Sequence, residues 1–534
     1  MKRVCVLFLF LLLSVPSSLV AQLLGPISSE FNSFRQNGIS TVELSPDFVW
    51  VSPFLNYAPY STVTGNWEIP NGVDSLTNRV GRVFSMDSQG DTLVVGLGFT
   101  SSTPAGNVPA GYGTYVSTDQ GNEWFFSPFL LDRYINEDTT FEYGGQIYNR
   151  QRVIVPEQSP PYSITVHDGV IFSANWASGL LRSPDLGRNW ERIILPPFGV
   201  KELLPDGTRY NWRNCVSSSG GTCTAYEQLY TAVSDDNLKG FAVMIDRHDR
   251  VWYGSAGGIN ISDNALKAPL DSIRWRNVGF NYDPDGLLAR WVIEIAEDPK
   301  TGYAWLTNWI AEGSGSNLQG LDNYGVVYSK DGGLSFEQRL HGEKILSIGF
   351  FRGSIYAAGE QGLFISSDGG NTWEMNNRFK TQTNLITEKA SFQSIASNDN
   401  YLFIGTSEGL LWTEAPEGPW NIERVNFPLT GGNNFEQESS NVSSYAYPNP
   451  YSPDLHGQIR IRFDSSTPEN AQLRIFDFSN TLVYETTEQT SSTGGYEILW
   501  NGYNMKGHQV DNGVYFYQIT LSNKTLEGKI LVIH

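Results

Sequence analysis

The 534-residue chain is poor in cysteine, in histidine and in long apolar runs. It has 3 cysteines and 6 histidines, so a structural zinc site is not expected, and we predict neither a metal nor a cofactor. Beyond the N-terminus, no apolar run is long enough to span a membrane. Charged residues make up only 17% of the chain, and the formal net charge is -20. This balance disfavours nucleic acid or an anionic membrane as a partner.

The N-terminus has the features of an export signal. Lys2 and Arg3 precede an apolar run that is too short and too close to the chain start to favour a spanning helix. Small residues follow toward Ala21. This order is typical of a secretory signal peptide over residues 1–21, so we expect a mature chain outside the cytoplasm with no transmembrane segment.

Removal of that signal leaves two cysteines, Cys215 and Cys223, on either side of a Gly/Ser-rich stretch. In an oxidising compartment, two nearby cysteines without further ligands favour a disulfide over a metal site. We predict that they pair and close a small surface loop.

Short alternating runs are abundant, with 13% aromatic residues and 53 glycines. One turn, S-x-D-x-G-x-x-W, recurs after such runs, with Phe336 replacing Trp in one copy. Its copies lie within residues 115–124, 180–190, 327–336 and 363–373. Each belongs to a unit of four short runs, which is typical of an antiparallel sheet. Six units and a weaker one at residues 41–70 predict a β-propeller over residues 22–427. We expect about seven blades, although six or eight also fit.

The repeated turn has a physical explanation. Its Asp can accept backbone N–H groups of its own hairpin, its Gly supplies a positive φ, and its Trp can pack between blades. Asp263 could head a lengthened version in another blade. The four Asp positions are Asp119, Asp185, Asp331 and Asp368. The turn resembles the Asp-box (sialidase or BNR) repeat, which implies a structural role for these aspartates at the rim of a propeller.

The resemblance to Asp-box enzymes does not extend to their catalytic residues. The arginine motif and arginine triad of the sialidases cannot be mapped onto this chain. Xyloglucanases with this repeat use two tandem propellers, whereas one is predicted here. No phosphate-binding loop, nucleophile elbow or kinase motif is present. We therefore assign no catalytic residue from the sequence.

Candidate ligand-binding residues are expected on the face opposite the repeated turns. Long loops should gather there, and loops of such length are often functional. These loops are residues 97–113, 131–161, 196–225 and 307–325. The same face should carry Trp176, Trp309, Glu312, Glu360 and Glu408. Tryptophan rings stack on sugars, and a pair of carboxylic acids would serve glycoside hydrolysis. The alternative is that these side chains pack loops or face solvent.

A polar linker over residues 428–444 precedes residues 445–534, whose short strands predict an Ig-like β-sandwich. Its motifs are Tyr447-Pro448-Asn449-Pro450-Tyr451, Trp500-Asn501-Gly502 and Asn512-Gly513-Val514-Tyr515-Phe516. They resemble the type A sorting domain of type IX secretion, and the Ig-like domain of flagellar hook-capping proteins shares part of the pattern. The first resemblance implies the type IX secretion machinery as the partner of residues 445–534. It also implies export via the periplasm of a Gram-negative bacterium. A merely stabilising cap is the alternative.

Together these features predict an all-β protein that is secreted or held at the outer cell surface. We expect its propeller to be a non-catalytic module that binds an extracellular glycan or protein. A glycoside hydrolase or lyase that uses carboxylates on the long-loop face is the alternative, so enzymatic activity stays undecided. An assembly factor with a stable protein partner is a third hypothesis.

Overall fold

The computed structural model describes residues 23–27, 34, 36–63, 67–70, 81–104, 106–133, 139–219, 222–281, 283–310, 324–425 and 442–534. The predicted signal peptide, and residues 428–441 of the predicted linker, lie outside this part of the chain. The chain divides into two units, Asn32–Val425 and Met1–Phe31 with Asn426–His534. Its described helical elements are single turns: η1 (Tyr60–Thr62), η3 (Asp236–Leu238), η4 (Leu270–Ser272) and α1 (Pro453–His456).

The larger unit consists of antiparallel sheets that follow one another along the chain. The first three are β2 (Val42–Leu44), β3 (Phe48–Val51) and β4 (Asn56–Pro59); β5 (Gly81–Gln89), β6 (Thr92–Thr103), β7 (Gly106–Ser117) and β8 (Phe125–Pro128); and β11 (Pro161–His167), β12 (Val170–Asn175), β13 (Gly179–Ser183) and β14 (Glu191–Arg192). The fourth contains β18 (Gly240–Ile245), β19 (Val251–Ser255), β20 (Gly258–Ser262) and β21 (Trp275–Val278), with β15 (Glu202–Leu203) added at its edge.

Three further sheets complete the series. They are β22 (Trp291–Glu297), β23 (Ala304–Trp309), β24 (Gly325–Ser329) and β25 (Glu337–Arg339); β26 (Ile345–Phe351), β27 (Ser354–Gly359), β28 (Leu363–Ser366) and β29 (Glu374–Asn376); and β32 (Phe392–Ser397), β33 (Leu402–Thr406), β34 (Gly409–Thr413) and β35 (Asn421–Glu423). A short pair, β30 (Phe379–Lys380) and β31 (Leu385–Ile386), lies between the last two in the chain.

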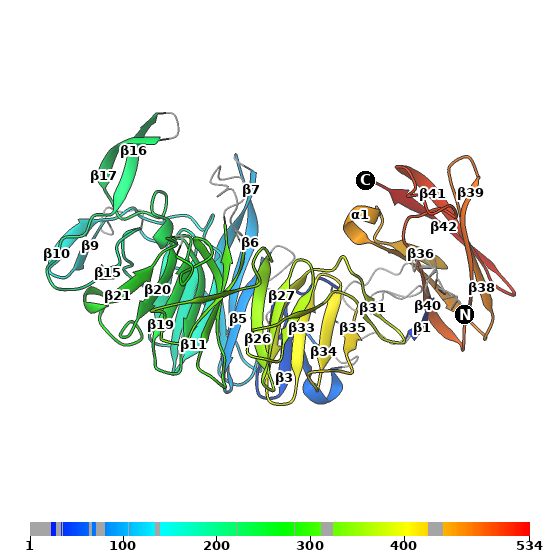
Figure 1. Cartoon of the computed structure of the whole chain (residues 1–534), viewed down its shortest axis with the longest axis horizontal. Coiled ribbons are helices and arrows are strands. Elements are labelled where there is room, and N and C mark those ends of the chain that lie inside the picture. The colour runs from blue at the N-terminus through cyan, green and yellow to red at the C-terminus, as the bar shows by residue number, and fades with distance from the viewer. Residues whose placement is uncertain are drawn as a thin grey trace, which may run out of the picture. The chain divides into compact units, whose positions relative to one another are not determined.

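The first strands of these sheets form a closed series. Each contacts the first strand of the next sheet, in the order β2, β5, β11, β18, β22, β26 and β32, and β32 contacts β2 again. The first strands therefore surround the centre of a ring, which is the arrangement of a β-propeller. Figure 1 shows strands of these sheets side by side, with the ring seen from its side. The predicted all-β propeller fold is confirmed.

The ring closes through residues near the start and the end of this unit. Ile39 N donates to Thr406 O (2.9 Å), and Val425 N donates to the side-chain oxygen of Asn37 (2.7 Å). The first sheet has three strands, and an isolated bridge between Tyr57 and Glu68 extends it. This irregularity explains why the first unit gives only a weak sequence signal.

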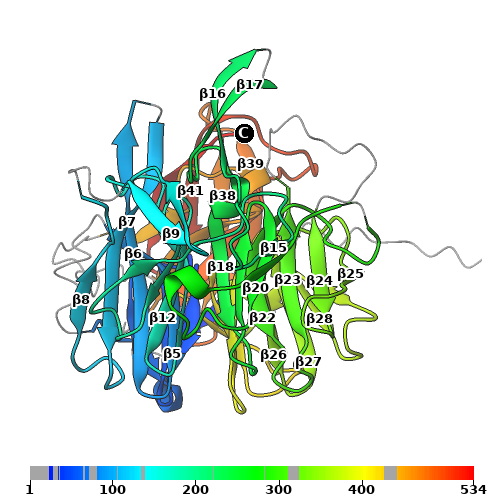
Figure 2. The ribbon, with the colours of Figure 1, turned by 90° about the vertical axis from the view of Figure 1, so that its left-hand side faces the viewer.

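Three of the four segments that we predicted as long loops contain regular hairpins, and residues 311–323 of the fourth lie outside the described part of the chain. Residues 97–113 are mainly strand, because β6 and β7 stay paired as far as Thr103 and Gly106, so the loop prediction was wrong there. The segments 131–161 and 196–225 contain β9 (Thr140–Tyr143), β10 (Gln146–Asn149) and β16 (Arg213–Ser219), and β16 pairs with β17 (Thr222–Gln228). Figure 2 shows these hairpins at one end of the propeller, where β6 and β7 also extend.

Aromatic side chains pack the β9–β10 hairpin against the segment before β16. Trp212 is fully buried, and its ring meets Tyr148 edge-on at 5.0 Å and Phe141 at 5.6 Å. The ring of Tyr230, which follows β17, packs against the rings of both Trp212 and Phe141. The two long connections therefore pack into one hydrophobic core together with the third and fourth sheets.

The smaller unit is a β-sandwich, as predicted. Its sheets contain β36 (Ser444–Tyr447), β37 (Ile459–Ser465), β38 (Asn470–Phe476), β39 (Leu482–Gln489), β40 (Gly494–Trp500), β41 (Gly513–Thr520) and β42 (Thr525–Val532). The motif residues build its core: Tyr451 and Trp500 are buried, and Asn449 hydrogen-bonds the backbone of Lys529 and Leu531 in β42.

One strand of this sandwich comes from the other end of the chain. β1 (Leu23–Ile27) pairs antiparallel with β40, although we had placed residues 22–427 together in the propeller. That boundary was wrong for residues 23–27. A five-residue segment carries too little pattern to show which distant sheet edge it joins.

Candidate functional site

The repeated turns lie at the end of the propeller opposite the hairpins, since they join the third and fourth strands of their sheets. In one copy, Ser366 Oγ donates to Asp368 Oδ1 (2.8 Å) and accepts from Gly370 N (2.9 Å). Asp368 Oδ1 also accepts from Thr372 N (2.9 Å), and these bonds lower the pKa of Asp368 to about 2. The same Ser–Asp and Ser–Gly bonds occur around Asp119, Asp185 and Asp331.

The fourth sheet carries a modified version of this turn. Ser262 Oγ hydrogen-bonds Asn264 Oδ1 at 3.1 Å, so Asn264 takes the place of the aspartate. Asp263 instead faces Arg274 at 3.5 Å on the surface, and our assignment of Asp263 was wrong. The amide oxygen of Asn provides the same acceptor as a carboxylate, which explains the replacement.

The opposite end of the propeller carries a feature that we did not predict. In six of the first strands, the pairing register with the second strand shifts by one residue close to the strand start. The residues at these bulges are Phe84, Tyr162, Phe241, Ile293, Leu346 and Gln393. All six are partly exposed, whereas the residues just before Phe84, Ile293, Leu346 and Gln393 are buried. A bulge therefore adds one partly exposed side chain near the start of the first strand in each of these sheets.

Aromatic residues from four consecutive sheets form a continuous line at this end. Ring centroids are separated by 6.1 Å for Phe84–Tyr162, 6.0 Å for Tyr162–Phe241 and 5.0 Å for Phe241–Trp291. Trp176, directly after β12, lies 5.2 Å from Phe241 and 5.9 Å from Trp291. We call these five residues the aromatic row. All five are partly exposed, so their rings offer apolar surface to a ligand.

Trp176 also lines a pocket of about 590 Å³ beside the aromatic row. Its walls are residues 151–155, 157 and 158 from one long connection, residues 176–179 from the turn after β12, Arg192 of β14, and residues 230–233, 238 and 239 between β17 and β18. Two apolar side chains of these walls, Val155 and Val233, are 47% and 72% exposed, so the rim is apolar and open to solvent.

Cations lie over the aromatic rings of this face, although the chain as a whole is acidic. The guanidinium of Arg82 is 4.5 Å from the ring centroid of Phe84, and Lys239 Nζ is 5.5 Å from that of Trp176. Lys239 also pairs with Asp236 at 2.6 Å. Glu157 is the one carboxylate among the described residues that line the pocket, and it accepts from Ser101 Oγ at 3.0 Å.

Among the described residues, the other predicted site residues do not line the pocket with Trp176. Trp309 donates from Nε1 to Ile345 O (2.8 Å), and Lys344 Nζ lies 4.7 Å above its ring. Glu360 pairs with the same lysine at 2.7 Å. Glu408 accepts from Thr387 N (2.9 Å) and Oγ1 (2.6 Å). Glu312 lies outside the described residues.

Two other carboxylates with a raised pKa lie instead in contacts between blades. Glu294 in β22 accepts from Ser347 Oγ (2.9 Å) and Ile348 N (2.8 Å) of β26, and burial raises its pKa to about 8. Asp87 in β5 accepts from Val166 N (2.6 Å) of β11 in the same way, and burial raises its pKa as well. These acids connect adjacent first strands.

The described residues contain no group of three or more His, Cys, Asp or Glu that could hold a metal ion. Among the same residues, no helix is long and apolar enough to cross a membrane.

The fold and this site define a β-propeller joined to an Ig-like domain. Residues 452–525 match the family model of the FlgD Ig-like domain. A search of the curated proteins found no match.

Several solved propeller structures are similar to the chain. YCF48 from Cyanidioschyzon merolae is 16% identical over 72% of this chain and 97% of its own, with a TM-score of 0.42. A GH74 enzyme of Niastella koreensis is 11% identical over 94% of this chain and 73% of its own, with a TM-score of 0.44. PorZ, a surface component of the type IX secretion system of Porphyromonas gingivalis, is 14% identical over 93% of this chain and 81% of its own, with a TM-score of 0.30. At these values the likeness carries no argument about function.

Proposed function

We propose that the protein is an exported binding protein whose propeller holds a glycan chain across the aromatic row and in the adjacent pocket. The observation that carries this proposal is the aromatic row itself. Its five rings are partly exposed and lie at the end of the propeller that carries the long hairpins. One of them, Trp176, also lines the pocket. Aromatic rings with one open face supply large contact area at low conformational cost, as sugar rings require.

A binding role fits the carboxylates better than a catalytic one. Glycoside hydrolysis needs two acids that face each other across the substrate, about 5–10 Å apart. Here Glu157 stands in the pocket, while Glu360 is bound to Lys344 and Glu408 to Thr387. We therefore propose that Trp176 is the main ligand-binding residue among those predicted from the sequence.

The test uses the mature chain, residues 22–534, with immobilised polysaccharides. Both retention and soluble products are measured. We expect retention without products, and we expect Trp176→Ala to weaken it at least about tenfold, which corresponds to about 1.4 kcal/mol.

Trp309→Ala is the matched control, because Trp309 is also a partly exposed tryptophan at the end of a second strand but does not line the pocket. Equal losses in both variants would contradict the role of Trp176. Binding of an extended peptide instead of any polysaccharide would replace the glycan by a protein ligand. Products that disappear with Glu157→Gln would establish an enzyme.

We further propose that the four repeated turns are Asp-box turns and that residues 445–534 direct export by the type IX secretion machinery after removal of residues 1–21. The sequence motifs around Tyr451 and Trp500 support this proposal, because they build the core of a domain that matches the FlgD Ig-like family. The expected location is the outer surface or the surroundings of a Gram-negative cell. Deletion of residues 445–534 should leave the propeller in the periplasmic fraction. Unchanged export would contradict this role.

A further inference from the structure

The sheet of the C-terminal unit that contains β36, β37 and β40 is completed by the N-terminal segment. Its strand order is β1-β40-β37-β36, so β40 would be an edge strand without β1. In the register of this pair, Leu23 lies opposite Ile498, Leu24 opposite Glu497 and Ile27 opposite Gly495. Figure 1 shows β1 beside β40. Uncovered edge strands expose unpaired N–H and C=O groups that accept other extended chains.

β40 is a central part of this unit rather than a peripheral one. Tyr496, Ile498 and Trp500 are all buried in the core between the two sheets. Glu497 is also buried, and its carboxylate pairs with Arg460 at 3.2 Å and accepts from Tyr447 Oη. Loss of β1 would therefore expose the edge of β40 next to a buried ion pair, where a change of the surroundings of the two charges is unfavourable.

The sequence of β1 suits a terminal strand. Pro26 has no N–H group and cannot donate a backbone hydrogen bond to a neighbouring strand. Proline in sheets is therefore confined to edges and irregular positions. The register of β1 with β40 shifts between Leu24 and Ile27, the interval that contains Gly25 and Pro26. β1 can thus pair with β40 on one side without offering a regular edge on the other.

We infer that the C-terminal domain is a split domain into which the propeller is inserted. A single cut in the linker therefore does not separate the propeller from the C-terminal domain. The chain runs from β1 into Asn32–Val425 and returns through residues 426–441 to β36. A cut within 426–441 leaves β1 covalently joined to the propeller and paired with β40. Release would need a second cut before Asn32 or removal of β1 from the sheet. This inference goes beyond the proposed function and does not depend on the ligand or on the export route.

The first test is amide hydrogen exchange on the mature chain. The variant replaces residues 23–27 by Gly/Ser residues of equal number, and the control makes the same replacement at residues 437–441. We expect exchange in residues 494–500 to accelerate at least about tenfold in the variant only, because the outward amides of β40 lose their partners. Faster exchange throughout residues 442–534 would also support the inference, whereas unchanged exchange in β40 would overturn it.

The second test cuts the linker. A recognition site for a specific protease is placed within residues 428–434 of the mature chain, and the cut protein is analysed by size-exclusion chromatography. We expect the two fragments to elute together and to separate when residues 23–27 are replaced. Separation of the fragments while residues 23–27 are intact would overturn the inference. A failure of glycan binding leaves both results unaffected, so this inference and the proposed function fail independently.

Discussion

The substitution Gly370→Ala tests how the repeated turns join the blades. Gly370 has a φ of +88°, and a Cβ atom added to it would lie 2.5 Å from Trp305 Cη2 of the preceding blade. Trp305 is 1% exposed and stacks on Tyr328 at 4.3 Å, so its ring has little room to move. The neighbouring Gly369 has a φ of +77° but no atom within 4 Å of an added Cβ, which makes Gly369→Ala the matched control.

The two substitutions differ in only one contribution to the free energy of unfolding. A residue with a Cβ in the left-handed region costs about 1–2 kcal/mol, and both variants bear this cost. Overpacking against a fixed ring adds about 1–3 kcal/mol in Gly370→Ala alone. We expect Gly370→Ala to lower the free energy of unfolding by about 2–5 kcal/mol and Gly369→Ala by about 1–2 kcal/mol. Urea unfolding followed by tryptophan fluorescence measures both. Equal effects within about 0.5 kcal/mol would refute the packing of this turn on Trp305.

Three further predictions concern other parts of the chain. Asp368→Ala removes the acceptor of the Thr372 N–H and should lower the free energy of unfolding in urea, while Asp368→Asn, which keeps an acceptor, should lower it less; the reverse order would contradict the network. Because burial raises the pKa of Glu294 from 4.5 to about 8, the folded state binds its proton more tightly, and this contribution to stability is lost as pH rises through that window. The Tm of Glu294→Gln should therefore depend less on pH between 5 and 8 than that of the wild type, and parallel curves would show that Glu294 does not titrate there. Replacement of Cys215 and Cys223 by Ser should speed proteolysis between β16 and β17 and change the free energy of unfolding by less than about 0.5 kcal/mol, whereas a global loss of stability would show that the hairpin supports the propeller.

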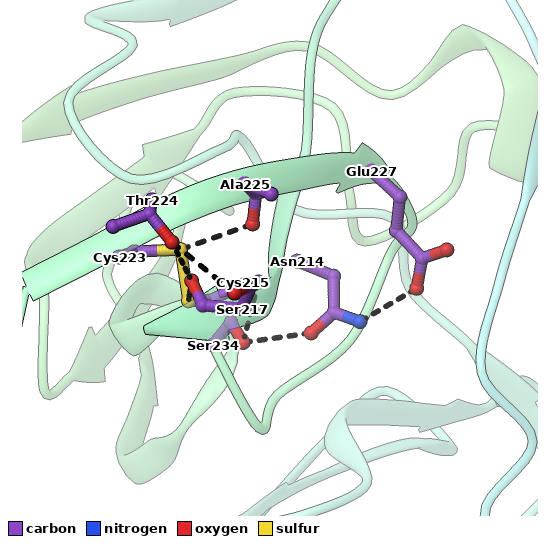
Figure 3. Close-up of a disulfide and its surroundings, with 8 residues drawn as sticks. All are labelled: Asn214, Cys215, Ser217, Cys223, Thr224, Ala225, Glu227 and Ser234. Atoms are coloured by element: carbon purple, nitrogen blue, oxygen red, sulfur yellow. Dashed lines mark hydrogen bonds between the residues drawn. A yellow bond between two sulfur atoms is a disulfide. The ribbon is translucent and has the colours of Figure 1, made fainter. Parts of the chain in front are cut away.

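The last of these predictions rests on the exposed position of the hairpin formed by β16 and β17. Figure 3 shows the bond between Cys215 and Cys223, whose Cα atoms are 5.8 Å apart, with Thr224 donating to Ser217 across the strands. Val216 and Tyr226 are 54% and 57% exposed, so this hairpin has no core of its own. An isolated two-stranded hairpin is marginally stable, and the disulfide keeps its strands together.

The repeated turns made the fold predictable from the sequence. A turn such as Ser366–Trp373 combines an acceptor, a left-handed glycine and a large apolar side chain within a few residues, so its structure is determined locally. The propeller follows, because small sheets of this kind must stack to bury their faces. The substitution of Asn264 for Asp was missed, although the S-x-D spacing of the other copies points to residue 264 rather than to Asp263.

The aromatic row was harder to predict, because it depends on β-bulges. Strict alternation of buried and exposed side chains breaks at Tyr162 and Phe241, because a bulge shifts the pattern by one residue at each position. A break in alternation at the same place in several units was the available signal. Trp176 could be found, because it directly follows a second strand. Glu360 and Glu408 also lie between a second and a third strand, but their partners Lys344 and Thr387 come from elsewhere in the chain, and no local pattern reveals them.

The two ends of the propeller are stabilised by different kinds of contact, and this difference supports the proposed position of the binding site. At one end the four Ser–Asp turns repeat with the same bonds, and their glycines and tryptophans pack on neighbouring blades, so a change there alters stability. At the other end the second sheet extends into the long β6–β7 hairpin, while β9, β10 and the segments that flank β16 and β17 share a core around Trp212 with the third and fourth sheets. Variation at this end leaves the ring intact, because the first strands contact one another independently of the hairpins. A ligand-binding surface can therefore form between the hairpins and the ring, where Trp176 belongs to both the aromatic row and the pocket.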